Sequence, residues 1–570
     1  MYTASTAFLE ALQECGVACI FANFGSDHPA LIEALAEARA TGRRVPTVIT
    51  CPNEMVALSA AHGYAQATGR AQAVLVHVEC GTQSLAGAMH NAAKGRAPVL
   101  IFAGLSPFTQ SGELRGSRNE FIQWIQDVYD QPGLVRGYVK YENQLRTGRN
   151  VKQIVARAMQ FAHSDPKGPV YLTGAREVME EETTPVALDY EEWQPIAPTA
   201  LPPDAVTMLA DDLLRAHRPL VVTSYLGRNH AAVTALHALA GALGLGVLES
   251  VPSHLNFPAD DTLYQGNQWN QPRQNAALAA ADLVLVLDSD VPWIPAVSKP
   301  AAAARIWHID VDPLKQQMPL WYIPARHVFR ADVATALGQL AAALEGRAVD
   351  PALLASRRAH YGGLHAQRAA RLLELEREPA GEITAEYAVA CVRGQLDAGT
   401  IVVNESISNY HAVIDHLHLT RPGAMLASGG GSLGWNGGAA IGVKLARPER
   451  SVVAFTGDGS YMFSVPSTVH WMARHYATPF VTVIFNNRGW KSPKLSALAV
   501  HPSGHASRAN DLDVAFDPPP DYAGIAAAAG GAAPFTVKRP RDLPAAVAEA
   551  FRVVREERRC AVLDIWIAHL

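Results

Sequence analysis

Two polar segments, each at the end of an apolar run, contain residues that could bind a phosphorylated ligand and a divalent cation. The sequence Gly-Asp-Gly-Ser occupies residues 457–460, and Asn487 ends the next apolar run, with a predicted helix at 465–475 between them. Glycine lets the backbone approach a phosphate closely, and the N-terminus of a helix presents free N–H groups to it. Asp458 and Asn487 offer the oxygen ligands that Mg²⁺ takes, with phosphate oxygens, water or a backbone carbonyl completing its octahedron. The pattern therefore predicts a diphosphate and Mg²⁺ site. A dinucleotide site is the rival, but no GxGxxG motif follows a strand and opens a helix.

A carboxylate near the N-terminus could serve in acid–base catalysis. Glu54 follows Cys-Pro-Asn and opens a predicted helix of small residues at 54–68. An acidic residue in a first helical turn is by itself an ordinary partner of the helix dipole. If Glu54 is buried, its pKa rises and it can exchange a proton with a bound group.

Apolar runs alternate with amphipathic helices along the whole chain, which favours parallel sheets with helical crossovers. An acidic and then proline-bearing linker at 180–203 and a charged connecting helix at 346–382 divide the chain into three blocks. We therefore predict an α/β protein with three doubly wound parallel-sheet domains, at 1–180, 204–345 and 383–570. Such sheets bind ligands at the carboxyl ends of their strands. The expected strands are 18–24, 73–77, 99–103 and 169–172, then 219–224, 246–249, 283–287 and 306–309, and finally 401–404, 452–456, 480–486 and 561–567.

Composition excludes several classes of protein. The 570 residues include 48 basic and 53 acidic side chains, a net charge of −5, which argues against a nucleic-acid-binding protein. With 49% apolar and 18% charged residues, the chain is neither disordered nor a small disulfide scaffold. The six cysteines form no CxxC pair, and so few cysteines in a long chain suggest a reducing compartment. We find no signal-peptide pattern and no apolar run long enough for a membrane helix, so we expect a soluble cytoplasmic protein.

The motifs at 457–460 and 487 resemble the cofactor signature of the thiamine-diphosphate-dependent superfamily that contains pyruvate decarboxylase and acetolactate synthase. The resemblance implies pyrimidine-binding, middle and diphosphate-binding domains, in that order. It implies that Asp458, Asn487 and the backbone carbonyl of Gly489 bind Mg²⁺. It further implies a set of residues at the cofactor: Ser406, Ser408, Gly431, Leu433, Gly457, Gly459 and Ser460. Among these, the backbone of Gly431 would contact the 4′-amine, and Leu433 would hold the two cofactor rings in a bent arrangement.

In the same superfamily, the segment around Glu54 resembles the one that carries the activating acid. The resemblance implies that Glu54 shares a proton with N1′ of the cofactor pyrimidine. Because Glu54 and the diphosphate motif lie in different blocks, one site must join two blocks. In this family they come from different subunits, so a homodimer or homotetramer with active sites between subunits is implied.

On the substrate side, the segment 77–93 is similar to benzoylformate decarboxylase, which implies a proton-transfer role for His77. Residues 23–26, Asn-Phe-Gly-Ser, also resemble an early loop of that enzyme, which implies contact of Ser26 with a substrate carboxylate. Gln126, Trp490 and Lys491 are weaker candidates for the substrate pocket. The likeness is incomplete, because residues 104–112 lack the His-His pair of pyruvate decarboxylases and residues 288–295 lack a second histidine.

We therefore expect an enzyme that cleaves or forms a carbon–carbon bond of a 2-oxo acid, by decarboxylation and with carboligation to an aldehyde as a further outcome. An acetolactate-synthase-type carboligase and a 2-hydroxyacyl-CoA lyase stay open as alternatives. A catalytically silent cofactor-binding protein is the alternative outside the enzymes. No feature of the middle block indicates FAD or a nucleotide, and FAD stays an open question.

Overall fold

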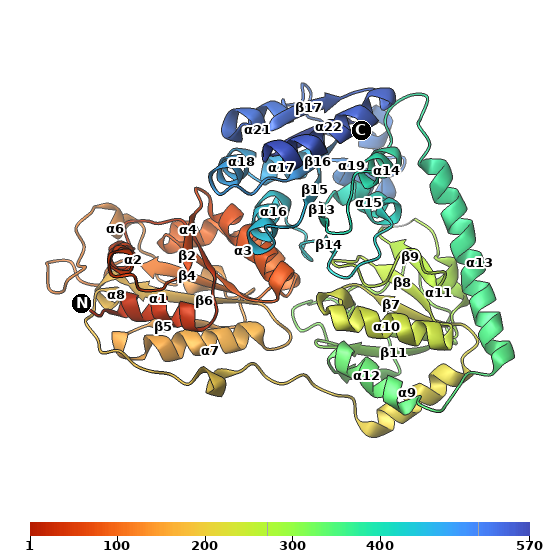
Figure 1. The fold of residues 1–570 in the computed structure, drawn as a ribbon, viewed down its shortest axis with the longest axis horizontal. Coiled ribbons are helices and arrows are strands. Elements are labelled where there is room, and N and C mark those ends of the chain that lie inside the picture. Colours follow the sequence, from red (N-terminus) through yellow and green to blue (C-terminus); the bar gives the residue numbers. More distant parts are fainter. Residues whose placement is uncertain (271, 511) are drawn as a thin grey trace.

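Three parallel sheets of six strands each form the framework of the chain (Figure 1). The structure is a computed structural model that describes residues 1–270, 272–510 and 512–570. The strand orders are β2-β1-β3-β4-β6-β5, β12-β11-β10-β7-β8-β9 and β14-β13-β15-β16-β18-β17. In each sheet the chain first adds strands on one side and then crosses to the other, which is the doubly wound arrangement. The predicted fold class is confirmed.

The strands follow one another in three sets. The N-terminal sheet contains β1 (Cys19–Ala22), β2 (Thr47–Thr50), β3 (Gln72–Val76), β4 (Val99–Leu105), β5 (Glu142–Leu145) and β6 (Pro169–Ala175). The middle sheet contains β7 (Pro219–Thr223), β8 (Gly246–Ser250), β9 (Tyr264–Gln268), β10 (Leu283–Leu287), β11 (Arg305–Asp310) and β12 (His327–Arg330). The C-terminal sheet contains β13 (Ile401–Glu405), β14 (Met425–Leu426), β15 (Val452–Gly457), β16 (Val481–Asn486), β17 (Ala533–Val537) and β18 (Ala561–Trp566).

Helices cover the sheets and connect the domains. The N-terminal domain has α1 (Ala4–Glu14), α2 (Pro29–Thr41), α3 (Glu54–Thr68), α4 (Val78–Ser84), α5 (Ala86–Lys94), α6 (Ile122–Ile125), α7 (Val151–His163) and α8 (Arg176–Met179). The middle domain has α9 (Pro203–Arg215), α10 (His230–Leu243), α11 (Ala276–Ala280) and α12 (Val333–Ala343), and α13 (Pro351–Leu375) runs along its outside toward the C-terminal domain (Figure 1). The C-terminal domain has α14 (Ala385–Arg393), α15 (Tyr410–Leu417), α16 (Trp435–Ala446), α17 (Asp458–Phe463), α18 (Pro466–His475), α19 (Lys491–Val500), α20 (His505–Ala509), α21 (Tyr522–Gly530) and α22 (Leu543–Arg552). Among the residues that the structure describes, no helix combines the length and the apolar character that crossing a membrane requires.

All twelve strands expected from apolar runs are present, and they are the four inner strands of each sheet. The six strands that the sequence analysis did not anticipate are the two edges of each sheet: β2, β5, β9, β12, β14 and β17. Several edge strands alternate between buried and exposed residues or are partly polar, as in Tyr-Gln-Gly-Asn-Gln of β9 and His-Val-Phe-Arg of β12. A strand covered on both faces and paired on both sides reads as a continuous apolar run, whereas an edge strand does not.

Two glycine-containing helices hold the N-terminal and C-terminal domains together. Helix α3 packs against α16, and both domains' sheets flank this contact (Figure 1). A Cβ atom at Gly442 would lie 1.9 Å from the carbonyl oxygen of Ala60, and one at Gly63 would lie 2.4 Å from the carbonyl oxygen of Ala439. The absence of side chains there lets the two backbones touch, and a strip of buried apolar side chains continues through both domains.

The middle domain contacts the N-terminal domain through charged and aromatic groups. Arg96 donates two hydrogen bonds to the carboxylate of Asp290, at 2.9 and 2.8 Å, and its guanidinium lies 4.2 Å from the centre of the Tyr225 ring. The Tyr225 hydroxyl donates to Asp310 at 2.6 Å. These groups occupy the carboxyl ends of β7, β10 and β11, where a doubly wound sheet reverses its strand order.

The close contact between α3 and α16 predicts a specific stability effect. Gly442→Ala places a methyl group against the Ala60 carbonyl, so we expect the free energy of unfolding to fall by about 1–3 kcal/mol, as overpacking does. Urea denaturation followed by tryptophan fluorescence measures it. Gly362→Ala in α13 is the matched control, because a Cβ there meets nothing within 4 Å. It should be neutral or stabilising by about 0.5–1 kcal/mol. Equal effects of the two substitutions would contradict the packing argument.

Candidate active site

The ends of β15 and β16 bring the sequence-predicted metal ligands into one turn. Asp458 begins α17, and its two carboxylate oxygens accept the N–H groups of Gly459 at 2.8 Å and of Gly489 at 2.9 Å. The Asn487 side-chain amide donates to the carbonyl of Gly489 at 3.2 Å. Gly489 has φ +149°, a conformation that side chains rarely adopt. The structure thus brings Asp458, Asn487 and the Gly489 carbonyl, the three predicted Mg²⁺ ligands, into one turn.

The chemistry of this turn fits a divalent cation and a phosphate group. Asp458 is 1% exposed, and burial raises its pKa to about 6 although backbone N–H groups of Gly489 and Gly459 oppose the rise. No ion pair among the described residues gives Asp458 a cationic partner, so a bound cation would offset the cost of burying its charge. A Cβ at Gly457 would meet nothing within 4 Å, which leaves open space beside the turn. Ser460 lies in the first turn of α17 and is buried.

A second cluster forms at the carboxyl ends of β1 and β3. His77 Nδ1 lies 2.6 Å from Asp27 Oδ1, and His77 Nε2 lies 2.9 Å from Gln126 Oε1. The other oxygen of Asp27 accepts the backbone N–H of Val78 at 3.1 Å. Gly25 and Gly104 make room for the cluster, since a Cβ there would lie 2.0 Å from His77 Nδ1 or 1.8 Å from Asp27 Oδ2. Asp27 was not anticipated from the sequence, although it directly follows Ser26.

This arrangement favours a positively charged His77. Both ring nitrogens face oxygen atoms, so both donate only when the imidazole is protonated. The hydrogen bond to Asp27 raises the pKa of His77 against the opposing effect of burial, and the charges of Asp27 and Glu54 act in the same direction as that hydrogen bond. Gln126 is buried, with 3% of its surface exposed, and its side chain contacts His77. The hydroxyl of Ser26 is shielded from solvent and has no hydrogen-bond partner in the described structure.

Glu54 lies at the N-terminus of α3, as expected, but the single chain leaves it half-buried rather than buried. Asn53 caps the helix by accepting the N–H of Val56 at 3.2 Å, which fixes where α3 begins. A Cβ at Gly81 would lie 3.6 Å from Glu54 Oε1, so the carboxylate faces the turn that follows His77. No hydrogen bond or ion pair of the described residues joins Glu54 or His77 to Asp458 or Asn487 within this chain.

The end of β13 and the loop before α16 form the remaining part of the predicted cofactor site. The Ser406 hydroxyl donates to Asn404 at 2.7 Å, so it is used locally, whereas Ser408 is half-buried and makes no described side-chain hydrogen bond. Glu405 is a residue that the sequence analysis missed. It accepts the N–H groups of Trp435 at 3.1 Å and Asn436 at 3.0 Å, and burial raises its pKa to about 7. It thereby fixes the start of α16, directly after Leu433 and Gly434.

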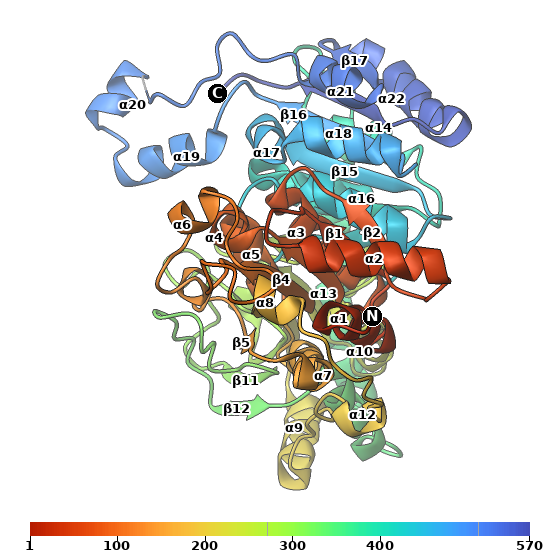
Figure 2. The same cartoon turned by 90° about the vertical axis from the view of Figure 1, so that its left-hand side faces the viewer.

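Trp490 and Lys491 precede and begin α19, which lies beside the body of the C-terminal domain together with α20 (Figure 2). The Trp490 ring packs edge-on against Phe516, with ring centres 4.9 Å apart, and a Cβ at Gly459 would lie 2.6 Å from it. Trp490 is therefore adjacent to the Asp458 turn. Lys491 forms no ion pair among the described residues.

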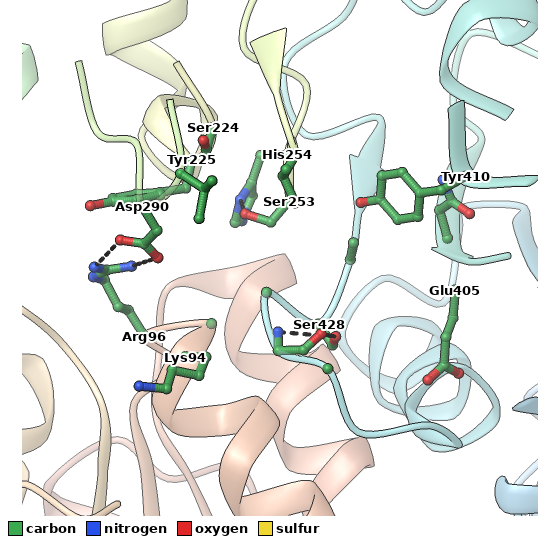
Figure 3. Close-up of a pocket in the computed structure, with 18 of the residues that line it drawn as sticks. Lys94, Arg96, Ser224, Tyr225, Ser253, His254, Asp290, Glu405, Tyr410 and Ser428 are labelled. Carbon is green, nitrogen blue, oxygen red and sulfur yellow. Dashed lines mark hydrogen bonds and ion pairs between the residues drawn. The ribbon is translucent and has the colours of Figure 1, made fainter. Parts of the chain in front are cut away.

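A cavity of about 360 Å³ lies where the three domains meet. Figure 3 shows the loop that carries Ser428 passing between the segment of Lys94 and Arg96 on one side and Glu405 on the other. Tyr225, His254 and Asp290 of the middle domain close the cavity opposite that loop (Figure 3). His90 and Lys94 at the end of α5 line the cavity together with this loop.

Three family models match successive parts of the chain. The N-terminal thiamine pyrophosphate binding domain matches residues 2–133, the central domain of thiamine pyrophosphate enzymes matches 206–340, and the C-terminal thiamine pyrophosphate binding domain matches 407–565. The chain belongs to the thiamine pyrophosphate enzyme family. The superfamily expected from the motifs is thus confirmed, and the cofactor of this family is thiamine diphosphate.

Individual family members show the same relationship. Benzoylformate decarboxylase of Pseudomonas aeruginosa is 26% identical over 85% of this chain and 86% of its own length. Acetolactate synthase 1 of Zea mays is 25% identical over 84% of this chain and 73% of its own length. The structure of a thiamine-diphosphate-dependent 4-hydroxybenzoylformate decarboxylase from Rhodococcus jostii RHA1 superposes with a TM-score of 0.78, covering 100% of this chain and 99% of that chain at 21% identity. That last likeness shows a shared fold.

The Asp27–His77 contact in this family member predicts a pKa change. In Asp27→Asn the carboxylate that stabilises the imidazolium is gone, so the pKa of His77 should fall. The protonated form of His77 is then lost at a lower pH than in the wild type. Titration of the His77 ring signals by NMR, assigned with a His77→Asn variant, measures this shift.

Asp127→Asn serves as the control, since Asp127 pairs with Arg118 rather than with His77. It should leave the His77 titration unchanged. A His77 titration in Asp27→Asn that matches the wild type would show that Asp27 does not hold the imidazolium.

Proposed function

We propose that the chain is a thiamine-diphosphate- and Mg²⁺-dependent lyase that releases CO₂ from a 2-oxo acid. The observation that carries this proposal is the Asp27–His77 pair, in which the hydrogen bond to Asp27 raises the pKa of His77 and the charge of Glu54 acts in the same direction. Family membership supports the cofactor, and the likeness to proteins named benzoylformate decarboxylase supports the reaction.

The proposed cofactor residues divide into three tasks. Asp458, Asn487 and the Gly489 carbonyl would hold Mg²⁺, while Ser460 and the N-terminal turn of α17 would bind the diphosphate. Further contacts are assigned to Gly457, Gly459, Ser408, Gly431 and Leu433, with Ser406 supporting the turn through Asn404. When bound, thiamine diphosphate supplies the carbon nucleophile and the electron sink that cleavage next to a carbonyl requires. Glu54 would exchange a proton with N1′ of the pyrimidine ring.

The substrate side is assigned to Ser26 and His77. A protonated imidazole attracts the carboxylate of a 2-oxo acid, and the unpartnered Ser26 hydroxyl is free to donate to it. After CO₂ leaves, His77 would deliver the proton of Nε2 once Gln126 releases that nitrogen, which gives an aldehyde. Gln126 contacts Nε2 of His77. Trp490 and Lys491 are assigned to the edge of the substrate pocket.

Carboligation is the second candidate. Gln126 lies in the pocket beside His77, and an acetolactate synthase is among the similar proteins. If a second carbonyl compound reaches the site before His77 transfers its proton, the product is an acyloin rather than an aldehyde.

We also propose that the active enzyme is a homodimer or homotetramer. Glu54 is half-buried in the single chain, and the segment around Gln126 leaves the apolar side chains of Phe121, Ile125 and Tyr129 strongly exposed. A second copy would cover Glu54 and these apolar side chains.

Analytical ultracentrifugation measures the oligomeric state of the active enzyme. A purely monomeric active protein would overturn this assignment.

A product assay tests the proposed reaction. The purified chain is incubated with thiamine diphosphate and Mg²⁺ and with pyruvate, benzoylformate or a longer 2-oxo acid, with and without an acceptor aldehyde. Aldehyde and CO₂ in equal amounts are expected, and removal of Mg²⁺ by EDTA should abolish them. Acyloin without free aldehyde would favour the carboligase. No CO₂ from any of these acids would contradict the proposal.

Glu54→Gln tests the activating acid. The amide keeps the size of the side chain but cannot exchange the proton, so turnover should fall by about a hundredfold or more. The dissociation constant for thiamine diphosphate, measured by fluorescence titration, should change little. Glu33→Gln on α2, an exposed glutamate of the same domain, is the control and should leave turnover unchanged. Wild-type turnover in Glu54→Gln would refute the assignment.

A further inference from the structure

The end of helix α5 reaches from the N-terminal domain to the loop at residues 428–432 of the C-terminal domain. The Asn91 amide donates to the carbonyl of Ser432 at 2.8 Å and accepts the N–H of Ser432 at 3.1 Å. His90 Nε2 accepts the N–H of Gly431 at 3.0 Å. Asn91 is fully buried, and its side chain pairs with one backbone residue in the way that a neighbouring strand would.

Glycines allow this contact. A Cβ at Gly430 would lie 2.5 Å from Asn91 Oδ1, and one at Gly429 would lie 2.6 Å from the Cα of Gly95. A Cβ at Gly95 would lie 2.3 Å from the carbonyl oxygen of Ser428. Two of the loop glycines are therefore needed for packing against α5. A ligand is not required to explain them.

Within the described residues, His90 and Asn91 supply the hydrogen bonds that reach the middle of the loop from outside it. Gln66 and Ser253 hold its beginning, through the carbonyl and the N–H of Ala427 at 2.8 and 2.9 Å. Among the described hydrogen bonds to residues 430–432, those from outside the loop all come from His90 and Asn91. The backbone N–H of Gly431 is used in the hydrogen bond to His90. The backbone carbonyl of Gly431 can therefore accept a hydrogen bond from a ligand.

We propose that His90 and Asn91 are positioning residues that fix residues 428–432 in the conformation that receives thiamine diphosphate. This inference rests on the proposed function, which assigns Gly431 and Leu433 to the cofactor. If the loop is already ordered in the cofactor-free protein, less conformational entropy is lost on binding, and the affinity for the cofactor is higher. The pair touches neither the metal turn nor His77, and it acts through the loop alone.

Two pairs of variants test the proposal. Asn91→Leu removes both hydrogen bonds at similar volume and leaves the Ser432 groups unpaired, whereas Asn91→Asp keeps the acceptor for the Ser432 N–H. His90→Phe keeps a ring but removes the acceptor for the Gly431 N–H, whereas His90→Gln restores an acceptor near the same place. Lys94→Ala is the matched control on α5, because Lys94 donates to the carbonyl of Gln317 and not to the loop.

Two measurements are made on the full chain. Tryptophan fluorescence titration with thiamine diphosphate in excess Mg²⁺ gives the dissociation constant, which should rise about tenfold or more in Asn91→Leu, the usual cost of leaving buried polar groups unpaired. His90→Phe should weaken binding too, with partial rescue in His90→Gln. Amide hydrogen exchange of residues 428–434 in the cofactor-free protein should be faster in Asn91→Leu and His90→Phe. Lys94→Ala should match the wild type in both measurements.

The outcomes separate this inference from the proposed function. Wild-type affinity in both Asn91→Leu and His90→Phe would overturn the positioning role, whether or not loop exchange changes. Weaker binding of thiamine diphosphate without faster amide exchange of residues 428–434 would also overturn the positioning role, because a change in the loop would then not explain the lower affinity. If the wild type itself does not bind thiamine diphosphate, the proposed function fails instead. Should Asn91→Leu not fold, Asn91→Asp and the His90 pair decide the same question.

Discussion

The direct backbone contact between α3 and α16 is the constraint on which the candidate site depends. Both helices begin at residues of chemical interest, since α3 starts at Glu54 and α16 starts just after Leu433. Their crossing is close because glycine and alanine occupy the contact, and Glu405 and Asn53 fix where each helix begins. Small residues at the crossing therefore fix the relative position, within one chain, of the helix that begins at Glu54 and the helix that follows Leu433.

Buried carboxylates recur through the structure, and each is stabilised differently. Asp27 is paired with imidazoles, and His28, His77 and a backbone N–H lower its pKa although burial alone would raise it. Glu405 accepts helix N–H groups, and Asp290 and Asp310 meet Arg96 and Lys315. Asp458 has only backbone N–H groups for partners. Within the part of the chain that the structure describes, Asp458 and Glu405 are thus the carboxylates of this set without a cationic partner, and Asp458 is the one that lies in the Gly-Asp-Gly-Ser motif.

The inner strands and the motif around Asp458 could be predicted from the sequence because their local context determines their structure. The inner strands are continuous apolar runs because they are covered on both faces, and the motif around Asp458 joins a strand end to a helix start over a few residues. Edge strands such as β2 and β12 could not be predicted because they are partly exposed and admit polar side chains, whereas β9 is buried but polar and β14 has only two residues. The roles of Asp27 and Glu405 could not be predicted for a different reason. Their partners, His77 and the start of α16, are distant in sequence, and only the fold brings them together. The expected burial of Glu54 is not met within one chain, since the surface beside it is open.

His77 and the pair His90–Asn91 lie near opposite ends of one short run of structure. His77 directly precedes α4, Leu85 both ends α4 and begins α5, and α5 carries His90 and Asn91 to the loop before α16. A ligand at His77 that displaces this run by a fraction of an ångström also moves the support of the loop. Thermodynamic reciprocity then requires the two binding events to change each other's affinity by the same factor. If Glu54 and His77 serve a site completed by a second copy, that factor links the occupancy of one active site to that of the other.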